Sequence, residues 1–104
     1  MIKREMPPTH PGEVLKEIYL EPLGISVTEL AGNIGVARRT VSLIIKGHSG
    51  ISAEMALRLS KAFNTTPELW LNLQRSHDLW YASQKVSLEA IRHFTQNRNS
   101  GKDR

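Results

Sequence analysis

Cysteine is absent from the 104-residue chain, so a disulfide framework and a thiolate metal site are both excluded. A chain without cysteine suits a reducing compartment. Its amino-terminal residues, MIKREMPPTHPGE, lack the apolar segment of a secretory signal, and no apolar run approaches the length of a membrane span. These absences predict a cytoplasmic protein with no membrane partner.

Acidic residues are missing from one long central stretch. Between Leu30 and Ala53 there is no Asp or Glu, whereas Arg38, Arg39 and Lys46 are positively charged. A polyanion would meet no local repulsion at this stretch. The formal net charge of +4 favours an acidic partner without naming it, so the distribution of charge is more informative than its total.

The same stretch has the spacing of a helix-turn-helix motif. Apolar residues recur at helical intervals before and after Gly35, which indicates two short amphipathic helices. These residues are Leu30, Ala31, Ile34, Val41, Ile44 and Ile45. Gly35 permits the left-handed turn that ends the first helix, and Ala31 is small enough for two helices to cross closely. The first helix begins at Thr28, or earlier with Ser26 as its cap.

The second helix of the motif has a polar, basic face. Four polar residues lie off its apolar stripe: Arg38, Arg39, Ser42 and Lys46. The two arginines stand in the first turn, where a recognition helix meets base edges, so we predict that this helix binds DNA. The alternatives are a solvated face for the arginines and, for Lys46, a contact with the helix dipole.

An extended arm and a first helix are predicted before the motif. Residues 1–8 form the arm, in which Lys3 and Arg4 either contact phosphate or are solvated with the rest of the terminus. Thr9 or His10 precedes the helix, and the proline that follows opens it, because a missing N–H is harmless there. The residues expected to face inward are Val14, Leu15, Ile18 and Tyr19. Glu21-Pro22-Leu23-Gly24 is expected to end the helix.

Two further helices are predicted after the motif. A glycine-containing loop at residues 47–50 leads to a packing helix that begins at Ser52. The apolar stripe of this helix consists of Ala56, Leu59, Ala62 and Phe63. Thr66 then caps a fifth helix that runs from Pro67 to about Ser83.

The fifth helix has more apolar and aromatic surface than one face can bury in so small a core. Its tryptophans belong either to the core or to a contact with a partner. We predict a dimer interface formed by Trp70, Leu73, Trp80 and Tyr81.

The signal weakens after Ser83. Val86, Leu88, Ile91 and Phe94 have helical spacing and form either a sixth short helix or one that folds only on a partner. Residues 95–104 contain no apolar residue and should be disordered. The chain therefore divides into the arm at 1–8, a helix-turn-helix domain at 9–83 and a partly disordered extension at 84–104.

Neither an active site nor a metal site can be singled out. We find no paired carboxylates, no activated nucleophile and no phosphate-cradling glycine loop, so the chain is not expected to be an enzyme or to hold a cofactor. The four histidines are His10, His48, His77 and His93. None forms a close pair with another histidine in the sequence, so we predict no metal site. The adjacent His77 and Asp78 should diverge on a helix.

Three segments resemble the HigA antitoxins of the Xre/Cro helix-turn-helix group. They read HPGEVLKEIYLEPLGIS, GVARRTVSLIIKGHSGIS and ALRLSKAFNTTPELWLNLQ, and the resemblance covers about residues 9–74. The opening HPGE and the segment PELWLNLQ are the most specific parts. This resemblance implies an all-α, five-helix, lambda-repressor-like (Cro/C1-type) domain and a homodimer. It also implies binding to a palindromic operator in the protein's own promoter, and neutralisation of a HigB toxin, a RelE-like mRNA endonuclease.

The resemblance also assigns roles to residues of the motif. The DNA-binding positions that it implies are Thr28, Arg38, Arg39, Thr40, Ser42, Leu43, Lys46 and Ser49. Arg38 and Arg39 are the candidates for bidentate contacts to guanine, and Leu43 for a contact to a thymine methyl. Thr28 and Ser49 would bind phosphate. The sequence departs from the common pattern at Ala37, where a capping Ser or Thr is usual, and at Val27, where a phosphate-binding Gln often stands.

Two other functions remain open besides an antitoxin that both represses its operon and neutralises a toxin. In the first, the chain acts chiefly as a toxin-binding protein through its fifth helix and the segment from Val86 to Phe94. Alternatively, it is a phage-type Cro/C1-like regulator with no toxin partner. A toxin gene beside its own gene would separate the antitoxin from the phage-type regulator.

Overall fold

The computed structural model describes residues 7–95, and all regular structure in that range is helical. Its elements are α1 (Pro11–Val14), the π-helix η1 (Leu15–Leu20), α2 (Glu21–Leu23), α3 (Val27–Ile34), α4 (Arg38–Ile45), α5 (Ala53–Phe63) and α6 (Pro67–Lys85). The first three follow one another without a break, so the chain forms five helical rods, and the predicted all-α fold is confirmed. The predictions for Lys3, Arg4 and residues 96–104 lie outside the described residues.

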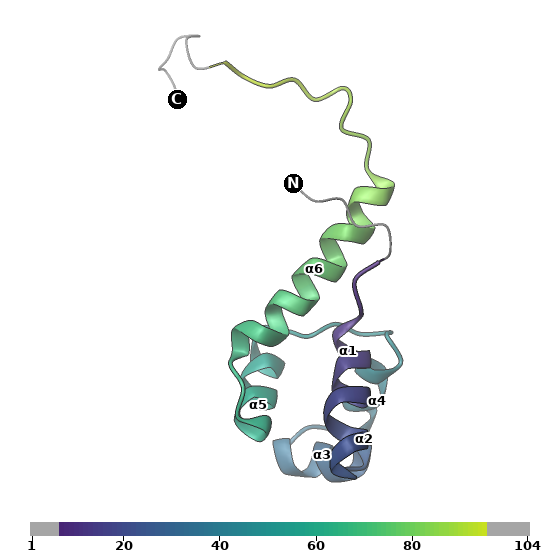
Figure 1. Ribbon diagram of the computed structural model, residues 1–104, viewed down its shortest axis with the longest axis vertical. Coiled ribbons are helices and arrows are strands. Elements are labelled where there is room, and N and C mark those ends of the chain that lie inside the picture. Colours follow the sequence, from purple (N-terminus) through teal and green to yellow (C-terminus); the bar gives the residue numbers. More distant parts are fainter. Residues whose placement is uncertain (1–6, 96–104) are drawn as a thin grey trace.

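Helices α1 to α5 gather at one end of the molecule, and α6 runs away from them toward the C-terminal extension (Figure 1). The core consists of apolar residues from every rod. Trp70 of α6 is its largest member and is 0 % exposed, as is Leu15 of the first rod. The prediction that Trp70 lies at a dimer interface is therefore wrong, because the side chain leaves no surface for a partner. Its indole N–H donates to the Thr65 hydroxyl at 2.9 Å, which satisfies its polar atom.

The first rod corrects the predicted inward face. Pro22 has no N–H, and its ring would clash with the carbonyl four residues earlier in an α-helix. The turns before it are π-helical instead, and the Glu21 N–H donates to the Lys16 carbonyl five residues back. This wider spacing buries Leu15 and Leu20, whereas Ile18 is 60 % exposed. The prediction that Ile18 faces inward assumed α-helical spacing and is wrong.

Both ends of the first rod lie where the sequence predicts them. His10 caps the start, since its Nδ1 accepts from the Gly12 N–H at 2.8 Å. Val14 and Tyr19 pack partly against the core, as predicted. The helix ends at Leu23, within the predicted segment 21–24, and Gly24 then turns the chain with a φ of 68°.

The helix-turn-helix has the predicted geometry. Ser26, and not Thr28, caps α3, because its hydroxyl accepts from the Glu29 N–H at 3.0 Å. Gly35 ends α3 in the left-handed conformation, with a φ of 76°. Ala31 of α3 is buried, 3 % exposed, as expected for the small residue predicted where α3 packs closely against α4.

Close packing also joins the first rod to α4. Gly12 is buried, and a Cβ added to it would overlap the carbonyl oxygen of Ile44. The glycine of the HPGE sequence therefore lets the start of α1 touch the end of α4. This contact helps to fix the direction in which α4 points.

The two carboxy-terminal helices begin as the sequence predicts. The hydroxyl of Ser52 accepts from the Met55 N–H at the start of α5, and that of Thr66 accepts from the Leu69 N–H at the start of α6. Helix α6 extends two residues beyond the predicted end at Ser83. No described helix is long and apolar enough to cross a membrane.

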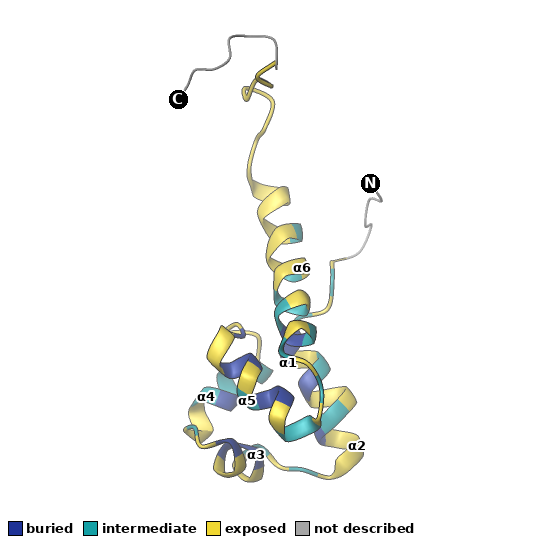
Figure 2. Cartoon of the chain, turned by 90° about the vertical axis from the view of Figure 1, so that its left-hand side faces the viewer, coloured by how far each residue is buried: buried dark blue, intermediate teal, exposed yellow. Residues whose placement is uncertain are grey.

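The extension beyond α6 contains no sixth helix within residues 86–95, only a turn at residues 89–90. Its apolar side chains are exposed: Val86 53 %, Leu88 61 %, Ile91 69 % and Phe94 79 %. Figure 2 shows the far half of α6 and this extension coloured almost entirely as exposed. In this chain alone, the predicted short helix does not form.

Candidate nucleic-acid interface

The outer face of α4 carries the two arginines predicted to read DNA. Both Arg38 and Arg39 are exposed in the first turn, while Val41 and Ile44 on the opposite face are buried. Ala37 precedes the helix and provides no side-chain cap. The core thus holds α4 by its apolar stripe and leaves its basic first turn open to a partner.

The other residues predicted on this helix lie around the same face. Thr40, Ser42 and Leu43 are partly exposed, and Lys46, directly after the last helical residue, is exposed. Ser49 is partly buried in the loop that follows. The structure therefore brings the predicted positions together on α4 and its flanking loop, although their contacts with DNA stay predictions.

Thr28 links the two helices of the motif. Its hydroxyl oxygen accepts from Arg38 Nε at 2.9 Å, and both residues are exposed. The family resemblance implies that Thr28 binds a phosphate of the DNA backbone. A hydrogen bond between Thr28 and an arginine was not predicted. The first turn of α3 and the first turn of α4 therefore meet through a polar contact on the outer surface of the motif.

The nearest acidic residues in the sequence point away from α4 or are already paired. Glu29 lines a small pocket with Ala62 and Phe63 on the α5 side of α3. Glu54 accepts from Arg58 Nη2 at 2.8 Å. Neither carboxylate faces the arginines of the first turn, so the positive potential of this surface is not cancelled locally.

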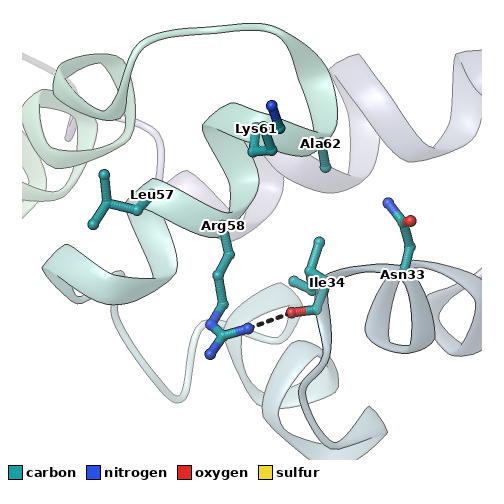
Figure 3. Close-up of a pocket in the computed structure, with 6 residues that line it drawn as sticks. All are labelled: Asn33, Ile34, Leu57, Arg58, Lys61 and Ala62. Carbon is teal, nitrogen blue, oxygen red and sulfur yellow. Dashed lines mark hydrogen bonds between the residues drawn. The ribbon is translucent and has the colours of Figure 1, made fainter.

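Arg58 anchors the end of α3, a role that sequence reasoning missed. Its Nη1 donates to the Ile34 carbonyl at 2.6 Å, and Figure 3 shows this bond crossing the space between α5 and α3. The last carbonyls of a helix have no partner within it, so the guanidinium satisfies one of them. The bond lies beside a surface pocket of about 530 Å³ lined by Asn33, Ile34, Leu57, Arg58, Lys61 and Ala62. Arg58 thereby holds the turn that sets the angle of α4.

Gln74 of α6 anchors the loop after α4, and it too was missed. Its Oε1 accepts from the Ile51 N–H at 2.7 Å, while its Nε2 donates to Asp78 at 2.9 Å. A Cβ at Gly50 would lie 2.9 Å from the same amide. A bond across 23 residues leaves no local signal in the sequence.

The histidines are closer together than predicted. The rings of His10 and His77 lie 4.8 Å apart, and His77 Nδ1 is 3.5 Å from the Asp78 carboxylate. The prediction that residues 77 and 78 diverge is therefore wrong, because Gln74 holds Asp78 beside His77. His10 and His77, far apart in the sequence, meet because the fold packs the start of the first rod on α6. Burial, reinforced by the neighbouring His77, lowers the pKa of His10 below its usual 6.5, against a smaller opposite effect from Asp78 and Glu13. In the described part of the chain no three potential ligands gather to hold a metal ion.

A buried helix-turn-helix with an exposed basic first turn defines a DNA-binding class of domain. A family profile described as helix-turn-helix matches residues 15–70. The chain belongs to the Xre-type helix-turn-helix family, together with HigA-type antitoxins. This family consists of DNA-binding regulators and antitoxins and not of enzymes.

Individual relatives agree with this assignment. An uncharacterized helix-turn-helix-type transcriptional regulator of Haemophilus influenzae is 51 % identical over 73 residues, which cover 70 % of this chain and 68 % of that relative. Antitoxin HigA-1 of Vibrio cholerae is 42 % identical over 90 residues, covering 86 % of this chain and 85 % of HigA-1. The match thus spans only about two thirds of the regulator but most of the antitoxin.

A solved structure of the antitoxin GraA in complex with its operator has the same fold. It superposes with a TM-score of 0.83 at 42 % identity and covers 91 % of this chain and 99 % of GraA. The predicted resemblance to HigA-type antitoxins is confirmed.

Proposed function

We propose that this chain is the antitoxin of a type II toxin–antitoxin system. It binds a palindromic operator in its own promoter as a homodimer, represses its operon and neutralises a HigB-type toxin in the cytoplasm. The observation that carries the DNA-binding part is the exposed, acid-free first turn of α4, with Arg38 and Arg39 on a helix fixed by the core. The operator-bound structure of its relative GraA supports the same part.

In this proposal α4 enters the major groove. Arg38 and Arg39 donate to guanine edges, and each bidentate contact contributes about 1–3 kcal/mol of discrimination. Leu43 meets a thymine methyl, Thr40, Ser42 and Lys46 contact the neighbouring groove and backbone, and Ser49 binds phosphate. Two copies place their recognition helices in successive grooves about 34 Å apart, so the operator is palindromic.

The far part of α6 is the dimer surface in this proposal. Leu73 packs partly against the core, Trp80 is partly exposed, Tyr81 is 41 % exposed and Leu79 is 62 % exposed. Apolar and aromatic side chains on a helix that leaves the domain are typical of an interface between subunits. A second copy would cover them.

In this proposal the toxin binds to the extension that follows Lys85. Val86, Leu88, Ile91 and Phe94 are exposed on a segment with no helix of its own, which is typical of a segment that orders on a partner. We expect a chain truncated after Lys85 to bind operator as before and to lose most of its affinity for the toxin. A full-length chain with serine at the four apolar positions is the matched variant. Unchanged toxin binding by both would assign the toxin contact to the folded domain.

Operator binding tests the DNA-binding part. Wild type and Arg38→Ala/Arg39→Ala are compared on promoter DNA and on random DNA at two salt concentrations. Wild-type binding should weaken by about 0.9 log units per tenfold increase in salt for each neutralised phosphate, and the double variant should lose discrimination between the two DNAs. Arg75→Ala/Lys85→Ala removes the same charge from α6 and should keep discrimination. Equal binding of wild type to both DNAs would contradict the proposal.

A phage-type regulator without a toxin is the second candidate, because the same face of α4 would serve it equally well. The H. influenzae relative, an uncharacterized helix-turn-helix-type transcriptional regulator whose name includes no toxin, is compatible with this candidate. Co-purification of the full chain with the product of an adjacent gene would decide for the antitoxin. The absence of any toxin gene beside it would decide for the regulator.

A further inference from the structure

We infer that Thr28 is a positioning residue that orients Arg38 for guanine and so determines specificity at one operator base pair. This inference rests on the proposed reading of DNA by α4. It differs from the role in phosphate binding expected from the sequence.

The contact uses one particular donor of Arg38. The Thr28 hydroxyl accepts from Nε at 2.9 Å, and the Arg38 side chain makes no other hydrogen bond within residues 7–95. A guanidinium has five N–H donors in a fixed plane, of which four are on the two terminal nitrogens. With Nε occupied, those two terminal nitrogens are the pair left to reach guanine O6 and N7.

The two helix starts make this contact rigid. Thr28 lies in the first turn of α3, which Ser26 caps, and Arg38 is the first residue of α4. Both helices are held in the core by their apolar faces. The arginine side chain is therefore fixed at its backbone and at its Nε, and little freedom remains between them.

The neighbouring arginine gives an internal comparison. Arg39 is exposed like Arg38, but its side chain has no hydrogen-bond partner in the described part of the chain. Ordering a long side chain on binding costs conformational entropy. Because the Arg38 side chain is already held by Thr28, it loses less conformational entropy on contacting a base than Arg39 does. The Glu29 carboxylate, next to Thr28 in sequence, lies on the α5 side of α3 and does not compete for Arg38.

Thr28→Val removes the hydroxyl at nearly constant shape, and Thr28→Ser keeps it. Each is measured by fluorescence anisotropy on a promoter duplex and on duplexes with every base pair of the footprint changed in turn, at two salt concentrations. Arg38→Ala identifies the base pair that Arg38 reads. We expect Thr28→Val to lose about three- to tenfold of discrimination at that pair only, with an unchanged salt slope, and Thr28→Ser to match wild type. Thermal unfolding of both variants should equal that of wild type, because residue 28 is exposed.

Other outcomes separate the alternatives. A uniform loss of affinity on all duplexes with a salt slope smaller by about one would make Thr28 a phosphate ligand and overturn the inference. Unchanged binding by Thr28→Val would show that the hydroxyl has no role and would also overturn it. Wild type could distinguish the promoter duplex from the changed duplexes while Arg38→Ala alters this preference at no base pair. That result would overturn the inference, because Arg38 would then contact no specific base, but sequence-specific DNA binding by the protein would stand. If wild type does not discriminate at all, the proposed function fails as well.

Discussion

The chain has two regions that differ in how much of their apolar surface they bury within one copy of the chain. Every buried apolar residue of the described chain lies between Pro11 and Trp70, and none follows Trp70. The packed domain is complete in one copy, and its contacts serve to orient α4. The far half of α6 and the extension expose their apolar side chains. The domain is thus a scaffold for recognition, and the rest of the chain is surface for partners.

The two tryptophans give the largest expected contrast between these regions. Trp70→Ala should destabilise the domain by about 3–5 kcal/mol, because it empties the centre of the core and leaves the Thr65 hydroxyl without its donor. Trp80→Ala should change the stability of one protomer little and weaken the dimer instead. Urea unfolding and sedimentation measure the two effects. A large loss of protomer stability in Trp80→Ala would erase the distinction between the regions.

Two glycines test close packing inside the domain. Gly12→Ala should cost about 1–3 kcal/mol, because its Cβ meets the carbonyl of Ile44 and pushes the first rod from α4. Gly32→Ala is the matched control, since nothing lies near an added Cβ on this exposed position of α3. It should stabilise the chain by about 0.5–1 kcal/mol. Thermal unfolding measures both, and equal effects would contradict the close contact.

The anchor at the end of α3 should give a smaller effect. Arg58→Met keeps the aliphatic stem but leaves the Ile34 carbonyl without its donor, so we expect a loss of about 1–2 kcal/mol and weaker operator binding. Lys61→Met, in the same pocket, should change stability by less than about 0.5 kcal/mol. Denaturant unfolding of the two variants tests this. Similar stability of both would mean that the bond does not hold the turn.

The smallest effect should be a pH dependence of stability. The pKa of His10 is lowered in the folded chain, so the unfolded chain binds more protons between that pKa and about 6.5. Stability should be constant above this window and fall as the pH decreases through it. His10→Asn keeps a capping side chain without titrating and should remove this component, whereas His48→Asn in the exposed loop should not. Thermal unfolding between pH 5 and about pH 8 measures it, and an identical pH profile for His10→Asn would contradict it.

Local signals predicted most of the fold. The caps at Ser52 and Thr66, the turn at Gly35 and the small residue at Ala31 each depend on a few neighbouring residues, and all four were confirmed. Ile18 was misplaced because the π-helical spacing arises from a clash between Pro22 and a carbonyl one turn earlier. That change of spacing is invisible to a count of apolar intervals.

Contacts between distant residues could not be predicted. The bonds from Arg58 to Ile34 and from Gln74 to Ile51 join residues more than twenty positions apart. The two tryptophans were treated alike because both lie in one long apolar helix. The packing of the first rod and of α5 around Trp70, through Tyr19 and Phe63, is what separates it from Trp80. The residues predicted to contact DNA lie close together because most of them belong to one short helix, α4, and their contacts with DNA stay predictions.

The most direct test of the central claim is a titration of the uniformly ¹⁵N-labelled chain with promoter duplex, followed by amide chemical shifts. If the packed domain presents α4 to DNA, the largest changes should map to Thr28 and residues 37–49, and residues 86–94 should not change. A random duplex should give smaller changes at the same positions. The largest changes falling instead on the far half of α6, with residues 37–49 unaffected, would contradict the division of the chain into a DNA-reading domain and a partner-binding remainder.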